Sequence, residues 1–146
     1  FRKDNEATAR KMYAFMHDAE PVQVGFVIHQ TIHMAGASPD SLIGDAGGLE
    51  LKVPNSATHI DTLLGAEIDP DYVKQCQWNM ACASRVWWDF GSYDPRLPPS
   101  MQLHVHRGQR DDKLIAELEA AVVEFIAEID VKIAALRARF GLKEAA

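Results

Sequence analysis

Residues 36–54 read GASPDSLIGDAGGLELKVP, and this stretch predicts two short strands joined by a turn. Apolar residues within 41–43 and 49–53 favour the strands, and the GDAGG segment between them is typical of a hairpin connection. Pro54 ends the second strand, because proline has no N–H to donate to a sheet. Side chains two positions apart leave a strand on the same face, so we expect Glu50 and Lys52 to lie side by side.

The segments outside this hairpin predict helices around further strands. Apolar residues at helical spacing predict helices over 2–17, 56–64 and 111–140, and Asp69 followed by Pro70 predicts a helix that runs to about residue 83. Residues 22–29, 86–93 and 101–107 predict strands, since they are rich in β-branched and aromatic residues or alternate in polarity. We expect the apolar stripe of the last helix to pack on the core. Helices flanking a central run of strands indicate an α/β or α+β sandwich.

The bulk composition is typical of one globular domain spanning residues 1–146. The chain is 47% hydrophobic and 25% charged, which is enough apolar residue to build a core without disulfides. Its two cysteines fit no redox or zinc motif and favour a reducing cytoplasm, and no signal peptide or membrane-spanning run is present. A net charge of -6 argues against a broadly basic DNA-coating protein. Phe1 stands where an initiator Met is expected, so we expect an N-terminal segment to be missing.

Acidic residues on the two hairpin strands predict a metal site. Asp40 would sit beside Glu50, and two close carboxylates repel each other and favour a bound cation. Mg²⁺ binds hard oxygen ligands, so the carbonyl of Leu51 could join the two carboxylates. Lys52 would orient or activate an attacking water, or stabilise developing charge on a phosphate. The alternative is a solvated face with a weak ion pair, which is the usual meaning of an E-x-K pair on a strand.

Five blocks in order along the chain resemble the phage lambda exonuclease and YqaJ-type viral recombinase family, within the PD-(D/E)xK nuclease superfamily. The two central blocks are similar to the family motifs G-A-S-P-D-G and G-L-E-(I/L)-K-C-P. The others resemble its E-x-x-A-R helix, its Y-x-x-Q-x-Q-x-x-M helix and its Y-D-P-R segment. The matching segments are residues 5–10, 36–40, 48–54, 72–80 and 93–96. Ser41 departs from the pattern, because the family usually has glycine there.

This resemblance implies an α/β fold, a central mixed β-sheet flanked by helices as in restriction-endonuclease-like nuclease cores. It implies an Mg²⁺-dependent exonuclease, with Mn²⁺ as a substitute, that acts on double-stranded DNA from a 5′ end and leaves a 3′ overhang. Asp40, Glu50 and the Leu51 carbonyl would bind the metal, and Lys52 would be the catalytic lysine. Glu6 would be a further acid near the metal, and Gln75 would line the site.

The resemblance also implies a homotrimeric ring that threads DNA and a partner protein that anneals the single strand. The protein would be encoded by a phage or prophage and act in the cytoplasm of a bacterial host. In a ring, we expect Lys74, Arg96 and Arg107 to face the DNA. The alternative for Arg96 is a simple turn after residue 93. Two other functions stay open: a restriction-like or repair endonuclease of the same superfamily, and a catalytically silent DNA-binding module.

Overall fold

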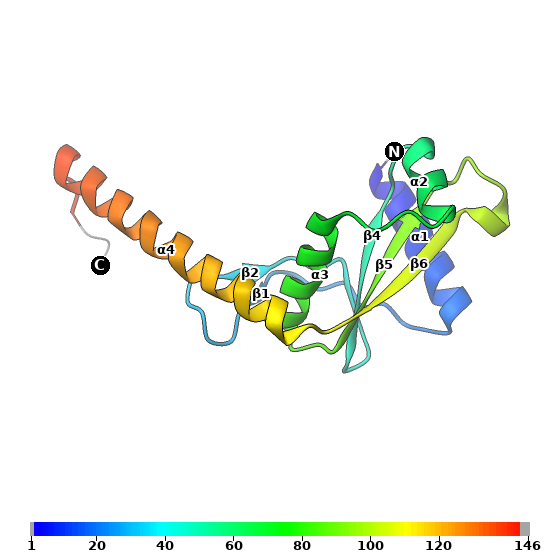
Figure 1. The fold of residues 1–146 in the computed structure, drawn as a ribbon, viewed down its shortest axis with the longest axis horizontal. Helices are drawn as coiled ribbons and strands as arrows, with labels where there is room; N and C mark the ends of the chain where they lie inside the picture. The colour runs from blue at the N-terminus through cyan, green and yellow to red at the C-terminus, as the bar shows by residue number, and fades with distance from the viewer. Residues whose placement is uncertain (1, 144–146) are drawn as a thin grey trace.

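A computed structural model describes residues 2–143 of the chain. Figure 1 shows a body of strands and helices from which one long helix projects. The order along the chain is α1 (Arg2–His17), β1 (Val27–Ile28), β2 (Gly36–Ala37), β3 (Ser41–Ile43), β4 (Gly47–Lys52), α2 (Ser56–Leu63), α3 (Pro70–Ala83), β5 (Trp87–Tyr93), the 3₁₀ turn η1 (Pro99–Met101), β6 (Leu103–Gln109) and α4 (Asp112–Phe140).

The body is built on a four-stranded mixed sheet in the order β3-β4-β5-β6. β3 and β4 form the antiparallel hairpin expected from the sequence, β4 runs parallel to β5, and β6 runs antiparallel to β5. In this register Glu50 lies opposite Phe90 and Lys52 opposite Ser92. The two charged residues therefore lie on an inner strand of a mixed sheet that helices flank, which confirms the expected fold class.

Each face of the sheet is covered by a different helix. Leu49 and Leu51 point to one face, where they pack with Ala9 and Tyr13 of α1. The opposite face carries a second cluster in which Cys76 and Met80 of α3 pack on Trp88 and Phe90. Because side chains alternate along β4, the residues between the two leucines and after them face α3. The strand thus buries leucine on one face and presents Glu50 and Lys52 on the other.

The strand expected over 22–29 is the main error of local interpretation. Only Val27–Ile28 pairs with β2, while Val22 makes an isolated bridge to Leu42 of β3. The two ends of the segment therefore pair with different partners, and Gly25 lies between them. Val22 and Ile28 stay 57% and 68% exposed, so β-branched residues here do not indicate a core strand.

The last helix was located correctly, but its expected packing was wrong. Asp111 caps its start by accepting a hydrogen bond from Leu114 N, and Gly141 ends it with φ of 64°. Ile115 is the one residue of α4 that is buried within the described chain. The stripe beyond it points to solvent, and Figure 1 shows the helix leaving the body. The exposed members of that stripe are Phe125, Ile129, Ile133 and Leu136.

Both cysteines are free and buried. Within residues 2–143, no helix has the length and apolar character that a bilayer crossing requires.

Candidate active site

Asp40 is fixed beside β4 by a hydrogen bond to the backbone. Its Oδ2 accepts from the N–H of Leu51 at 2.7 Å. β3 begins at Ser41, which pairs with Leu49, so the Asp40 side chain continues the pairing of the hairpin one step further. The hairpin geometry therefore sets the distance between Asp40 and the Glu50 carboxylate on the adjoining strand.

The two oxygens of the buried Glu50 carboxylate differ in their hydrogen bonding. It is 3% exposed, and its Oε1 accepts from Lys52 Nζ at 2.6 Å and from Gln75 Nε2 at 3.0 Å. Its Oε2 is buried and has no hydrogen-bond partner among the described residues. Burial and the charge of Asp40 raise the pKa of Glu50, and the bonds from Lys52 and Gln75 offset only part of that rise.

Lys52 is held as a cation. Burial disfavours its charge, but the hydrogen bond and charge of Glu50, together with the charge of Asp40, raise the pKa of Lys52 above its ordinary value. Its Nζ also lies 5.4 Å from the ring centroid of Tyr72. An ammonium with a raised pKa is a poor proton acceptor at neutral pH. The geometry therefore favours charge stabilisation or water orientation by Lys52 over general-base action.

The donor set around Glu50 fits a hard divalent cation. Glu50 Oε2 is a buried oxygen without a partner within the described chain, and the Asp40 carboxylate interacts with the same group. In residues 2–143, no three His, Cys, Asp or Glu side chains gather into a metal-binding cluster. Two carboxylates and a backbone carbonyl suit Mg²⁺, which keeps several waters, and do not make a closed structural zinc site. Nearby Cys76 does not change this, because burial raises the pKa of its thiol to about 12.

The other two predicted catalytic residues are placed differently. Gln75, on α3, donates directly to Glu50 and so joins the cluster. Glu6 lies partly buried on α1, one helical turn before Arg10, whose Nε donates to Ser41 Oγ at 3.2 Å. This puts α1 against the start of β3, next to Asp40. The catalytic role of Glu6 stays a prediction.

The three residues predicted to contact DNA do not form one patch. Lys74 is exposed on α3 beside Gln75. The Nε of Arg96 donates to buried Asp94 at 2.7 Å, and its Nη2 donates to the Pro54 carbonyl at 3.3 Å. Arg96 therefore helps to hold the turn after residue 93.

Arg107 lies on the α1 side of the sheet. Two of its nitrogens donate to buried Asp89 at 2.7 and 3.0 Å, and its guanidinium lies 3.6 Å from the Trp87 ring centroid. The Tyr13 hydroxyl of α1 donates to the same carboxylate at 2.5 Å. Arg107 thus faces away from Glu50 and binds α1 to the sheet, while contact with DNA stays a prediction for all three basic residues.

Sequence reasoning assigned no role at the site to two aromatic residues that lie near it. Tyr72 precedes Gln75 by three positions on α3, and its ring stacks on that of Phe90 with centroids 5.1 Å apart. Both line a cleft of about 620 Å³ that begins at Lys52. The helical spacing of Tyr72 and Gln75 was visible in the sequence, but Phe90 comes next to Tyr72 only through the packing of α3 on β5.

Comparisons with known proteins agree with this arrangement. A family model for the YqaJ-like viral recombinase domain matches residues 3–85. The ExoD protein of Escherichia coli (strain K12) is 33% identical over 70 residues, which are 48% of this chain and 79% of that protein.

Solved structures extend the likeness to the whole described fold. The alkaline exonuclease LHK-Exo from Laribacter hongkongensis is 44% identical, with a TM-score of 0.93 over 96% of this chain and 72% of that chain. Its crystal structure in complex with dAMP gives a TM-score of 0.92 with the same identity and coverage. A phage-related exonuclease from Haemophilus somnus 129PT is 13% identical with a TM-score of 0.59, covering 87% of this chain and 71% of that one, which supports the fold alone.

Proposed function

The chain belongs to the YqaJ-like viral recombinase domain family, and from this premise we propose that it is an Mg²⁺-dependent exonuclease that degrades double-stranded DNA from a 5′ end and leaves a 3′ overhang. It is homologous to an alkaline exonuclease, and the DNA-exonuclease role follows from that relationship. The observation that carries the finer proposal is the cluster of Asp40, Glu50, Lys52 and Gln75 around a carboxylate oxygen that has no partner among the described residues.

The residues of the cluster divide the chemistry of phosphodiester hydrolysis between them. Asp40, Glu50 and the Leu51 carbonyl would hold the metal, and Mn²⁺ would replace Mg²⁺ in the same oxygen set. A bound divalent ion lowers the pKa of water and offsets charge on phosphate oxygens. Lys52, held protonated by Glu50, places a compact positive charge where negative charge develops on the phosphate. Gln75 holds the Glu50 Oε1 in place by donating to it, which would leave Oε2 to bind the metal.

The proposed partners are DNA ends, two further copies of the chain in a homotrimeric ring, and a single-strand annealing protein. The exposed apolar stripe of α4 supports contact with another protein surface, because a run of exposed apolar side chains seldom remains uncovered in a functional assembly. The proposed setting is the cytoplasm of a bacterial host, with the gene carried by a phage or prophage. The description of the family as a viral recombinase supports it.

Digestion of matched DNA substrates tests this function. The protein is incubated with Mg²⁺ and either linear duplex or covalently closed circles, with a label at the 5′ or the 3′ end. Loss of linear DNA alone, with early release of the 5′ label and a block by EDTA, is the expected result. Cleavage of circles would replace the proposal by an endonuclease of the same superfamily. Absence of cleavage on both substrates would support a silent DNA-binding module.

A further inference from the structure

His59 of α2 is a fully buried histidine that has no part in the chemistry proposed above. It is 0% exposed, and hydrogen bonds engage both of its ring nitrogens. We propose that His59 is a positioning residue for Lys52, and that it acts through Ser92 and through the docking of α2 on the end of β5. The effect expected on turnover rests on the proposed function, whereas the effect expected on the lysine itself does not.

The partners of His59 decide which ring nitrogen carries the proton. Its Nε2 lies 2.8 Å from the Met101 carbonyl oxygen, which can only accept, so Nε2 donates. No carboxylate among the described residues bonds to the buried ring, which favours the neutral form. Nδ1 is then the bare nitrogen, and it accepts from the Ser92 hydroxyl at 2.7 Å. The ring therefore fixes the orientation of Ser92 and leaves neither nitrogen unpaired.

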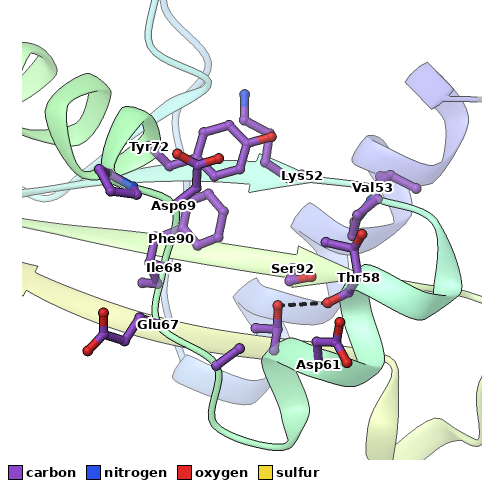
Figure 2. Close-up of a pocket in the computed structure, with 14 residues that line it drawn as sticks. Lys52, Val53, Thr58, Asp61, Glu67, Ile68, Asp69, Tyr72, Phe90 and Ser92 are labelled. Atoms are coloured by element: carbon purple, nitrogen blue, oxygen red, sulfur yellow. Dashed lines mark hydrogen bonds between the residues drawn. The ribbon is translucent and has the colours of Figure 1, made fainter.

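Ser92 links this histidine to Lys52. The two residues are register partners on the parallel strands β4 and β5, so their side chains leave the same face of the sheet. Ser92 is 3% exposed, and it lines the same cleft as Lys52. Figure 2 shows Ser92 between the strand that carries Lys52 and the helix that carries Thr58. A shift of Ser92 would therefore disturb the surface on which the lysine stem lies.

A second hydrogen bond fastens α2 next to the first. The Ser56 hydroxyl donates to Asp94 at 2.6 Å, and Ser56 lies one helical turn before His59. The two bonds therefore join one face of α2 to the end of β5. Lys52 is the last residue of β4, and only residues 53–55 separate it from α2. A connection this short transmits a rotation of α2 to the end of β4, so without His59 the bond at Asp94 would become a pivot.

Lys52 depends on this support because its own polar contacts are few. Its ammonium donates to Glu50 at 2.6 Å and lies 5.4 Å from the Tyr72 ring centroid, at the end of a flexible stem. A displacement of about 1 Å in a catalytic group can lower a rate by about a hundredfold. The same displacement has less effect on the affinity for DNA, to which many other contacts contribute. Loss of His59 should therefore lower turnover more than binding.

NMR of the Lys52 ammonium in the metal-free full chain tests the inference without DNA. His59→Leu removes both hydrogen bonds, and Ser92→Ala removes one of them with a smaller change in volume. In each variant we expect the Lys52 ammonium protons to exchange with solvent about fivefold faster or more. His59→Gln, whose amide offers both an acceptor and a donor, should stay within about twofold of the wild type. Tyr13→Phe is the matched control, because it removes a buried hydrogen bond to β5 on the opposite face, and it should exchange as the wild type does.

Digestion of linear duplex adds a second readout. In His59→Leu and Ser92→Ala, kcat should fall about tenfold while KM stays within about twofold, and His59→Gln should keep most of the wild-type kcat. Unchanged proton exchange at Lys52 in both His59→Leu and Ser92→Ala would overturn the proposal, and so would an equal increase in Tyr13→Phe. A wild type that degrades no DNA would refute the nuclease proposal alone, because the exchange measurement still decides the role of His59.

Discussion

Glu50 and Lys52 form a pair whose arrangement suits chemistry better than stability. A buried carboxylate with one unsatisfied oxygen and a second acid nearby is unfavourable for folding, and Lys52 compensates only in part. Strain and unsatisfied groups of this kind concentrate at functional sites. The physical reading therefore agrees with metal binding: a cation would satisfy the oxygen that the chain leaves without a partner among its described residues.

Removing the lysine alone should destabilise the metal-free protein. Lys52→Met leaves the buried Glu50 carboxylate without its main compensating charge, and we expect a loss of about 1–3 kcal/mol in the free energy of unfolding. The double variant Glu50→Gln/Lys52→Met removes both charges and should recover most of that loss. Urea denaturation in EDTA measures all three proteins.

Lys74→Met is the matched control for this cycle, since Lys74 is exposed on α3. Its free energy of unfolding should stay within about 0.5 kcal/mol of the wild type. A double variant no more stable than Lys52→Met would show that the pair itself stabilises the fold, contrary to the argument above.

At this scale the sequence predicted what depends on local geometry. Asp40, Glu50 and Lys52 lie in one hairpin, so strand alternation alone brings them together. Gln75 was placed at the site by resemblance, because its approach to Glu50 requires the packing of α3 on the sheet. Arg107 was assigned to a DNA channel from its charge, and no local pattern indicates that its partner is Asp89 on the neighbouring strand.

Among the connecting elements, the turn after β5 is the most tightly bound. Asp94 is fully buried and accepts hydrogen bonds from Ser56 Oγ at 2.6 Å and from Arg96 N at 3.0 Å. Burial opposes its charge, but the bonds from Arg96 and Ser56 dominate and lower the pKa of Asp94 to about 2. Since Ser56 begins α2, this carboxylate ties the start of α2 to the end of β5.

The lowered pKa makes this contribution depend on pH with a definite sign. The folded-state pKa of Asp94 lies below its ordinary value of 3.8, so its stabilisation is present above about pH 4 and is lost as the pH falls towards 2. We expect Asp94→Asn to lower the free energy of unfolding by about 2 kcal/mol at pH 7. The difference from wild type should fall to near zero at pH 2. Chemical denaturation across this pH range measures it, and a difference that stays constant down to pH 2 would contradict the assignment.

Element by element, the sequence predicted segments with strong local signals. The caps at Asp69 and Asp111 and the GDAGG turn allowed the positions of α3, α4 and the β3–β4 hairpin to be predicted closely. The segment over 22–29 was misjudged because β-branched composition does not reveal which strand lies beside it. The packing of α4 was misjudged because a periodic apolar stripe has the same pattern whether it meets the chain's own core or another surface.

The two parts of α4 should therefore respond differently to the same substitution. Ile115 is 2% exposed and Ile129 is 37% exposed. Ile115→Ala should cost about 3 kcal/mol through the cavity it creates, whereas Ile129→Ala should cost less than about 1 kcal/mol in dilute protein. Thermal and urea unfolding at low concentration give both values. Equal losses would mean that the outer part of the helix also packs on the body.

At the scale of the whole molecule, charge and shape both bear on the proposed assembly. The net charge of -6 disfavours binding of DNA to a generic surface, so a proposed duplex substrate would need a specific route to the site. The long helix projects from the body with side chains such as Phe125 and Phe140 more than half exposed (Figure 1). A single chain of this form neither encloses a duplex nor covers its own apolar stripe.

A cyclic homotrimer would enclose a duplex and cover the apolar stripe, and we expect the protein to form one. A ring of identical subunits closes through one repeated heterologous contact, so the stripe on α4 would meet a different surface of the next copy. Phe125 is 60% exposed and lies beside a cleft of about 360 Å³ between α4 and the β1–β2 region, which makes it a central test position.

Light scattering at micromolar concentration should give three times the chain mass for the wild type and for the control Glu124→Gln. Phe125→Glu should shift the mass towards one chain, because a carboxylate would be buried in the contact. A monomeric wild type would refute the ring, and a trimer that tolerates Phe125→Glu would place the contact elsewhere.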